Sequence, residues 1–170
     1  ITGAATGLGA AIAVALAKQG ADVAISDKPG EDLTKTAKEA KKHRTRVFEF
    51  EMDVRETKKI AGCLTKVIKE FKKIDILVNN AGVNLPSPGL DVTEDNWDEH
   101  YNTNVKGGFF TAQEAARYMI KQKKGRIIFI SSQSGLIGIP GQPVYCSTKG
   151  AINQLVRTLG VEWAKHGITV

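Results

Sequence analysis

The stretch Thr2-Gly3-Ala4-Ala5-Thr6-Gly7-Leu8-Gly9 decides how the chain folds, because it is a glycine-rich turn that leads directly into a helix. Residues 10–19 follow as a run of small apolar residues with helical periodicity, which ends at Gly20. A strand, a glycine turn and a helix N-terminus form an anion site, since free backbone N–H groups and the helix dipole point at the ligand. The alternative is a turn that only joins a strand to a helix.

The spacing of the glycines bears on what this turn holds. It is G-x-x-x-G-x-G, whereas the commoner dinucleotide fingerprint is G-x-G-x-x-G. Gly3 allows a tight turn, while Gly7 and Gly9 let the pyrophosphate of a cofactor and the neighbouring strand approach the backbone. The turn therefore predicts a dinucleotide site if the rest of the chain agrees.

An acid follows the next predicted strand, which covers residues 21–26. Asp27 stands about 20 residues beyond the glycine turn, where a carboxylate grips the ribose hydroxyls of NAD and repels the extra phosphate of NADP. Lys28 works against this distinction, but no Arg or Lys lies in the glycine turn itself. Asp27 also suits a turn ahead of Pro29-Gly30, and the two roles can coexist. NAD is the expected cofactor, with NADP second.

Strands and helices alternate along the whole chain. Hydrophobic patterns predict strands over residues 21–26, 46–52, 74–78 and 127–130, and helices over 10–19, 31–43, 57–71, 93–119 and 145–166. The strand over 74–78 is nearly all apolar, as in parallel sheets that are buried on both faces. This alternation predicts an α/β fold with an open, doubly wound parallel sheet in three layers, the Rossmann arrangement.

The candidate binding residues all follow the carboxyl ends of predicted strands. They are the glycine turn, Asp27, the segment Asn79-Asn80-Ala81-Gly82 and Ser132. In an open α/β sheet this edge is where ligands bind. Asn79 to Gly82 would let a cofactor lie close while the amide side chains brace the loop. A plain Asn-Gly type of turn is the alternative for that segment.

A tyrosine and a lysine at helical spacing suggest acid–base chemistry. Tyr145 and Lys149 are four residues apart and so share one helix face. A phenol has a pKa of about 10, and a nearby ammonium favours the phenolate. Ser132 could then bond to the oxygen whose charge changes as hydride moves. The alternative is an amphipathic helix with a half-buried tyrosine and a solvated lysine. Asn104 lies among apolar neighbours, so its side chain needs partners.

Composition limits the other classes of function. With 170 residues, of which 42% are hydrophobic and 25% charged, the chain is one globular domain, and no stretch is long and apolar enough for a membrane span. Cys63 and Cys146 show no metal or disulfide spacing, which suits a reducing cytoplasm, and no metal site is expected.

The net charge of +6 raises the question of nucleic-acid binding. Its basic segments, residues 38–46 and 121–126, fall where a helix is expected to end before a strand, and neither contains interleaved aromatic residues. Nucleic acid is therefore not an expected partner. The charge could still attract an anionic cofactor or an acidic substrate.

With these motifs in place, the chain resembles the short-chain dehydrogenase/reductase family over its whole length. Its cofactor turn matches the family's at Thr2 to Gly9, and residues 79–82 match the family's second cofactor motif. The catalytic tetrad of the family corresponds to Asn104, Ser132, Tyr145 and Lys149.

The resemblance implies a role for each of these residues. Tyr145 would be the general acid or base, and Lys149 would lower its pKa and hold the nicotinamide ribose. Ser132 would orient the substrate oxygen, and Asn104 would bind a water that links Lys149 to solvent. The implied cofactor contacts are Gly3, Thr6, Gly7, Leu8, Gly9, Asp27, Asp53, Val54, Asn80, Ala81 and Gly82, together with Tyr145 and Lys149.

The resemblance also concerns the whole protein. It implies a homodimer or homotetramer that pairs the helices holding Asn104 and Tyr145. Residues 1–170 are expected to be a single dinucleotide-binding domain, given as a fragment that lacks the first strand and the C-terminal substrate lid. The expected reaction is hydride transfer between a nicotinamide and a small alcohol or ketone.

Within the family, residues 131–149 most resemble gluconate 5-dehydrogenases and related sugar-acid dehydrogenases of carbohydrate metabolism. Asn84, Gln133 and Gln142 could contact a polyhydroxylated substrate, and the positive charge would suit its carboxylate. Two alternatives stay open: a member that acts on 3-ketoacyl or steroid-like substrates, and a regulatory protein that binds a dinucleotide without turnover.

Overall fold

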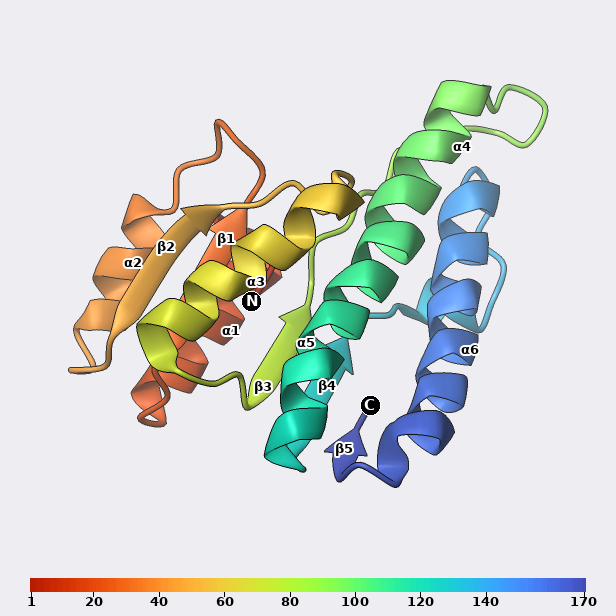
Figure 1. Ribbon diagram of the computed structural model, residues 1–170. Helices are drawn as coiled ribbons and strands as arrows, with labels where there is room; N and C mark the ends of the chain where they lie inside the picture. The colour runs from red at the N-terminus through yellow and green to blue at the C-terminus, as the bar shows by residue number, and fades with distance from the viewer.

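The computed structural model describes all 170 residues, and strands and helices alternate along them (Figure 1). In chain order the elements are α1 (Gly7–Lys18), β1 (Val23–Asp27), α2 (Thr34–Lys41), β2 (Val47–Glu51), α3 (Thr57–Phe71), β3 (Ile76–Asn79), α4 (Glu94–His100), η1 (Tyr101–Gly107), α5 (Gly108–Gln122), β4 (Gly125–Phe129), η2 (Gln133–Gly135), α6 (Pro143–Ala164) and β5 (Ile168–Thr169). Here η1 is a π-helix and η2 a single 3₁₀ turn.

Every strand pair is parallel, and the strands form two groups. Their orders are β2-β1 and β3-β4-β5. Ile1 and Thr2 lie between the groups, since Thr2 forms a parallel bridge with Ser26 and its N–H donates to the Val78 carbonyl at 3.1 Å. A cavity of about 390 Å³, lined largely by apolar residues, lies between β1 and β3.

Helices cover both faces of the strands, so the doubly wound Rossmann fold is confirmed. One apolar cluster joins α1 and α2 to β1 through small side chains such as Ala13, Ala17 and Ala37. The other packs α3, α5 and α6 through larger residues such as Ile60 and Met119. Figure 1 shows α1 behind the strands and α3 and α5 in front of them.

Several boundaries differ from those expected, each for a local reason. The helix predicted over 31–43 begins only at Thr34. Just before it, the Asp32 carboxylate accepts the Thr34 N–H at 2.8 Å, and this bond holds residues 32–34 in a turn. Helix α6 begins two residues before Tyr145, with Pro143 at its first position, where a proline needs no N–H partner. The helix predicted over 93–119 is confirmed in extent but contains η1 in its middle.

The basic segments lie away from the carboxyl ends of the strands. Helix α2 ends at Lys41 and α5 ends at Gln122, and each is followed within a few residues by the start of a strand. Their cations therefore gather at the amino ends of the parallel strands, whereas an α/β sheet binds ligands at the carboxyl ends. None of the helices combines the length and the apolar character that crossing a membrane requires.

Candidate active site

The glycine turn leaves an anion cradle at the start of α1. Gly3 and Gly7 have φ values of 64° and 57°, in the left-handed region that favours glycine. The first hydrogen bond into the helix runs from Ala10 N–H to the Thr6 carbonyl, so the N–H groups of residues 7–9 have no backbone partner. No acidic side chain lies in the first turn of the helix. This cradle fits the pyrophosphate of a dinucleotide.

A set of side-chain hydrogen bonds, which we call the brace, connects this turn to Asn80 and Ala81 after β3. Asn80 Nδ2 donates to the carbonyls of Thr2 and Gly3 at 3.0 and 2.9 Å. The Thr2 hydroxyl in turn accepts the N–H groups of Asn80 and Ala81 at 3.1 and 3.0 Å. A Cβ on Gly9 would lie against the Gly3 carbonyl and 2.5 Å from Asn80 Nδ2. Gly9 is therefore needed because Gly3 and Asn80 approach its backbone closely. The sequence prediction had expected the cofactor and the neighbouring strand to make this close approach.

A polar cavity of about 350 Å³ opens beside the turn, at the carboxyl ends of β1, β2 and β3. It is lined by the predicted cofactor residues Gly3, Thr6, Asp27, Asp53, Val54, Asn80, Ala81 and Gly82. Of the predicted residues of the turn, Gly7, Leu8 and Gly9 do not line it, and Leu8 is 55% exposed. Residues from four separate parts of the chain thus meet in one cavity, which we call the adenosine cavity after the half of the dinucleotide that it would receive.

Asp27 is held in place by the backbone. Its Oδ2 accepts the N–H of Ala5 at 2.9 Å, and its Oδ1 accepts the N–H of Lys28 at 2.9 Å. Each carboxylate oxygen can accept a further bond, so both remain able to receive a hydroxyl. The turn-forming and ligand-binding roles expected for Asp27 are therefore compatible.

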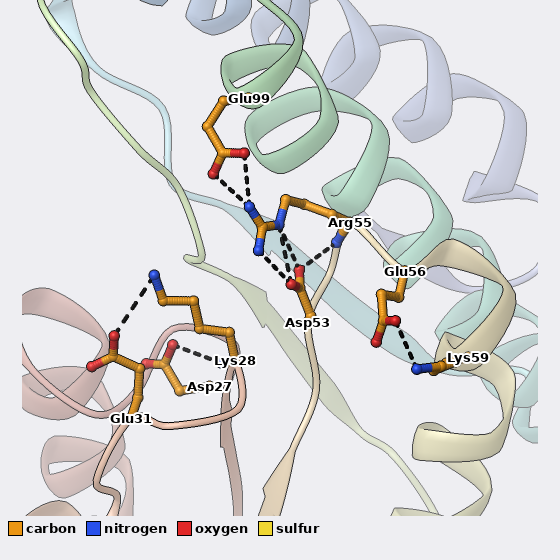
Figure 2. A network of polar contacts seen from close by, with 8 residues as sticks. All are labelled: Asp27, Lys28, Glu31, Asp53, Arg55, Glu56, Lys59 and Glu99. Carbon is orange, nitrogen blue, oxygen red and sulfur yellow. Dashed lines mark hydrogen bonds and ion pairs between the residues drawn. The ribbon is translucent and has the colours of Figure 1, made fainter. Parts of the chain in front are cut away.

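Asp53 belongs to an ionic network that the sequence prediction missed (Figure 2). Its Oδ1 accepts the backbone N–H of Arg55 at 2.9 Å, and its Oδ2 lies 2.6 Å from an Arg55 guanidinium nitrogen. The opposite side of the guanidinium pairs with Glu99 at 2.7 Å. The hydrogen bonds from the Arg55 side chain hold the pKa of Asp53 below its usual range. The Asp-x-Arg spacing was the available sequence signal.

This network gives a pH-dependent prediction for Arg55→Met. Because the folded-state pKa of Asp53 is lowered, the pair contributes stability above the unfolded pKa of about 3.9, and this is lost as pH falls through the folded pKa. The substitution raises the pKa of Asp53, because the side-chain hydrogen bonds from Arg55 are the largest cause of its lowering, whereas the backbone N–H of residue 55 and the Lys28 charge remain. We expect the free energy of unfolding to fall by about 1 kcal/mol at neutral pH, a small loss because Arg55 is partly exposed. In strong acid we expect no loss, because Asp53 is then protonated in both proteins.

Carboxyl-carbon NMR of Asp53 and denaturant unfolding at several pH values measure the two effects. An unchanged titration of Asp53 in the variant would contradict this account of the network.

Helix α6 places Tyr145 and Lys149 one turn apart. Lys149 is only 6% exposed, and its Nζ lies 5.5 Å from the centroid of the Tyr145 ring. The same Nζ donates to the Ile130 carbonyl, just beyond β4, at 2.7 Å. Burial lowers the pKa of the Lys149 ammonium. The alternative of a solvated lysine on an ordinary amphipathic helix is therefore wrong.

Asn104 connects the adenosine cavity to α6. It is 3% exposed within η1, its Oδ1 accepts the Val83 N–H at 2.7 Å, and its Nδ2 donates to the Val83 carbonyl at 2.9 Å. The second hydrogen of Nδ2 goes to the hydroxyl of Thr148, between Tyr145 and Lys149, at 3.2 Å. Since Val83 lines the cavity, one amide side chain connects the cavity to α6, the helix that holds Tyr145 and Lys149.

Ser132 lies at the start of η2, in a loop fastened to α6. Its Oγ accepts the Ser134 N–H and donates to the Ser134 Oγ, both at 3.1 Å. Nearby, Asn153 of α6 accepts from the Ser131 hydroxyl at 2.7 Å and donates to the Gly135 carbonyl at 3.1 Å. The structure contains no hydrogen bond between Ser132 and Tyr145, so Ser132 is placed by its loop.

The loops that carry Asn84 and Gln142 are joined by a side-chain hydrogen bond. Asn84 Nδ2 donates to Gln142 Oε1 at 3.1 Å, so these two predicted substrate contacts are partners. His100 is 1% exposed, accepts the Leu85 N–H at 3.1 Å, and has its ring 6.3 Å from that of Tyr145. The sequence prediction missed His100, because a single histidine carries no spacing signal.

Comparison with known proteins gives consistent matches. A family model described as short chain dehydrogenase matches residues 1–170. The 3-oxoacyl-[acyl-carrier-protein] reductase FabG of Thermotoga maritima is 36% identical over 170 residues, which are 100% of this chain and 69% of that protein. Gluconate 5-dehydrogenase of Gluconobacter oxydans is 32% identical over 174 residues, 100% of this chain and 66% of that protein. The crystal structure of NAD⁺-bound xylitol dehydrogenase superposes with a TM-score of 0.96 at 32% identity, covering 99% of this chain and 65% of that one.

Proposed function

Because the chain belongs to the short-chain dehydrogenase family, whose members are oxidoreductases, we propose that it transfers hydride between NAD and a secondary alcohol or ketone. One observation carries this proposal: the Asn104 side chain bonds both to Val83 of the adenosine cavity and to Thr148 of α6. A dinucleotide laid from that cavity toward α6 would bring its nicotinamide to Tyr145. We further propose that residues 1–170 form one dinucleotide-binding domain.

The preference for NAD rests on Asp27. A carboxylate at the end of β1 can accept the two ribose hydroxyls of the adenosine half, and it repels a phosphate in their place. The likeness to an NAD⁺-bound xylitol dehydrogenase supports this choice. Gly3, Thr6, Gly7, Leu8 and Gly9 would contact the pyrophosphate, whereas Asp53, Val54, Asn80, Ala81 and Gly82 would surround the adenosine.

Tyr145 moves the proton in the proposed reaction. The nicotinamide supplies hydride in reduction and accepts it in oxidation, while the Tyr145 hydroxyl donates a proton to the substrate oxygen or removes one from it. Lys149, buried and 5.5 Å from the ring centroid, favours the phenolate by its charge and would hold the nicotinamide ribose. The Ser132 hydroxyl would orient the substrate oxygen.

Proton supply is proposed to pass through Asn104. Both hydrogens of its amide are used within the protein, on Val83 and Thr148. Its Oδ1 accepts one bond and has capacity for another, and its backbone carbonyl lies in the π-helical turn. A water held at either oxygen would link Lys149 to solvent.

A polyhydroxylated substrate fits the amides of Asn84 and Gln142, whose Oδ1 and Nε2 stay free when the two side chains bond to each other. The likeness to gluconate 5-dehydrogenase favours a sugar acid such as gluconate, and that to xylitol dehydrogenase favours a neutral polyol. The net charge does not favour the acid, because the basic segments lie at the amino ends of the strands. The likeness to FabG keeps a 3-ketoacyl substrate as the second candidate.

An oligomer built on α5 and α6 is also proposed. Each helix exposes a large apolar side chain, Phe110 at 36% and Val161 at 82%. An exposed apolar side chain on each of these helices suits contact between copies of the chain.

The test is turnover on a substrate panel. NADH and NADPH absorbance is followed with gluconate, the alditol of the same chain length, their keto forms, and a 3-ketoacyl thioester. We expect turnover with the polyhydroxylated compounds of the panel, and a preference for NADH over NADPH. Tight NADH binding without turnover across the panel would contradict the proposed substrates, and it would leave a steroid-like substrate or a regulatory dinucleotide-binding protein.

A further inference from the structure

The charges that line the adenosine cavity are unevenly balanced. Four of the lining residues are carboxylates and two are cations: Asp27, Glu31, Asp53 and Glu99 against Lys28 and Arg55 (Figure 2). A coenzyme with a 2′-phosphate on its adenosine ribose needs a cation with free N–H groups to meet that phosphate. What the two cations already bind therefore decides whether such a coenzyme is accepted.

Arg55 has most of its guanidinium N–H groups bound to carboxylates, and only one N–H of Nη2 has no partner within the chain. Its Nε and one terminal nitrogen bond to Asp53, at distances of 2.6 to 3.1 Å. The other terminal nitrogen donates to both oxygens of Glu99 at 2.8 and 2.7 Å. The charges of two carboxylates at these distances more than offset that of the guanidinium, so the one N–H that is left offers a phosphate little net attraction.

Lys28 is the second cation, and it directly follows Asp27, the residue proposed to bind the ribose hydroxyls. Its backbone N–H bonds to Asp27, while its Nζ lies 3.7 Å from Glu31 Oε1. Both side chains of this pair are about half exposed, at 56% and 43%, so the pair contributes little to stability. The Glu31 charge nonetheless acts on any phosphate that enters the cavity, because the distances are shorter than a Debye length.

We propose that Glu31 and Glu99 are coenzyme-specificity residues, which exclude a 2′-phosphorylated dinucleotide by occupying Lys28 and Arg55. This inference rests on the proposed function, since it assumes that adenosine binds in this cavity. Asp27 alone repels a phosphate in place of the ribose hydroxyls. Glu31 and Glu99 add a separate effect, because they remove the cations that could otherwise compensate for that repulsion.

The experiment uses probes that isolate the 2′-phosphate. Adenosine 2′,5′-bisphosphate and adenosine 5′-monophosphate are titrated calorimetrically into the protein, into Glu31→Gln and into Glu31→Gln/Glu99→Gln. We expect the affinity ratio of bisphosphate to monophosphate to rise about fivefold in the single variant, the size expected for one unit charge acting on a phosphate through water. The rise is larger in the double variant and shrinks as salt is added.

Glu56→Gln is the matched control. Glu56 pairs with Lys59 at 2.7 Å with the same i,i+3 spacing, but neither residue lines the cavity. Glu56→Gln changes the net charge by the same amount as Glu31→Gln. It should leave the affinity ratio of bisphosphate to monophosphate unchanged. The same ratios should appear when NADPH and NADH are titrated by nicotinamide fluorescence.

The outcomes separate this inference from the function on which it rests. If neither nucleotide nor NADH binds, the dinucleotide site itself is wrong and the inference falls with it. If the monophosphate and NADH bind but the ratio is unchanged in both Gln variants, the proposed function survives and the specificity role is overturned. An equal change in Glu56→Gln would also overturn it, because the effect would then come from net charge alone.

Discussion

Tyr145→Phe is expected to lower kcat about a thousandfold, within the range found for removing a general acid or base, while NADH affinity stays within about twofold. The reason is that the hydroxyl has no hydrogen-bond partner within the chain, whereas the ring packs against Lys149 and His100. The substitution therefore removes the proton donor and leaves the packing in place. Steady-state kinetics and nicotinamide fluorescence measure the two quantities.

Tyr101→Phe is the matched control for that experiment. Tyr101 lies in η1, and its hydroxyl donates to the Ser147 hydroxyl of α6 at 3.1 Å. Its loss removes one ordinary hydrogen bond, worth about 1 kcal/mol of stability, and should change kcat by only a few fold. Turnover that persists in Tyr145→Phe, or falls equally in both variants, would contradict the role assigned to Tyr145.

Gly9→Ala is expected to have the second large effect, a loss of NADH affinity of about thirtyfold or more together with about 2 kcal/mol of stability. The new Cβ would collide with the Gly3 carbonyl and with Asn80 Nδ2. Asn80 cannot move aside without giving up its bonds to the carbonyls of Thr2 and Gly3. The anion cradle would therefore open. Calorimetric titration with NADH and denaturant unfolding give the two numbers.

Gly62→Ala, in the middle of α3, controls for the loss of a glycine. No atom lies within 4 Å of the added Cβ, and the backbone there is helical. Alanine should stabilise this helix by about 0.5–1 kcal/mol and leave NADH binding unchanged. Normal NADH affinity in Gly9→Ala would show that the brace between Asn80 and the turn does not shape the cofactor site.

The sequence predicted the fold well where the signal was local. Residues 57–71 were expected as a helix and form α3 with those bounds, because Ile60, Leu64 and Val67 repeat at core spacing. Thr93 was expected near a helix start, and its hydroxyl accepts the Asn96 N–H as a helix cap. The π-helical turn η1 was not predicted, since its pattern of apolar residues resembles that of an ordinary helix.

The site was harder to predict, because its bonds join residues that are far apart along the chain. Asn104 was expected to need partners, but its bonds to Val83 and Thr148 span 21 and 44 positions. The pairs Arg55–Glu99 and Asn84–Gln142 span 44 and 58 positions. Lys28 and Glu31, by contrast, are three residues apart, so that pairing could have been anticipated from the sequence.

The central claim, that hydride passes directly between the coenzyme and a carbinol carbon, is tested most directly with NADH deuterated at C4. The protein is mixed with this coenzyme and the keto substrate that turns over in the panel, and the product is analysed by mass spectrometry and NMR. Deuterium is expected on the carbinol carbon, transferred from only one of the two faces of the nicotinamide. A reduced product that carries solvent hydrogen on that carbon would contradict the central claim.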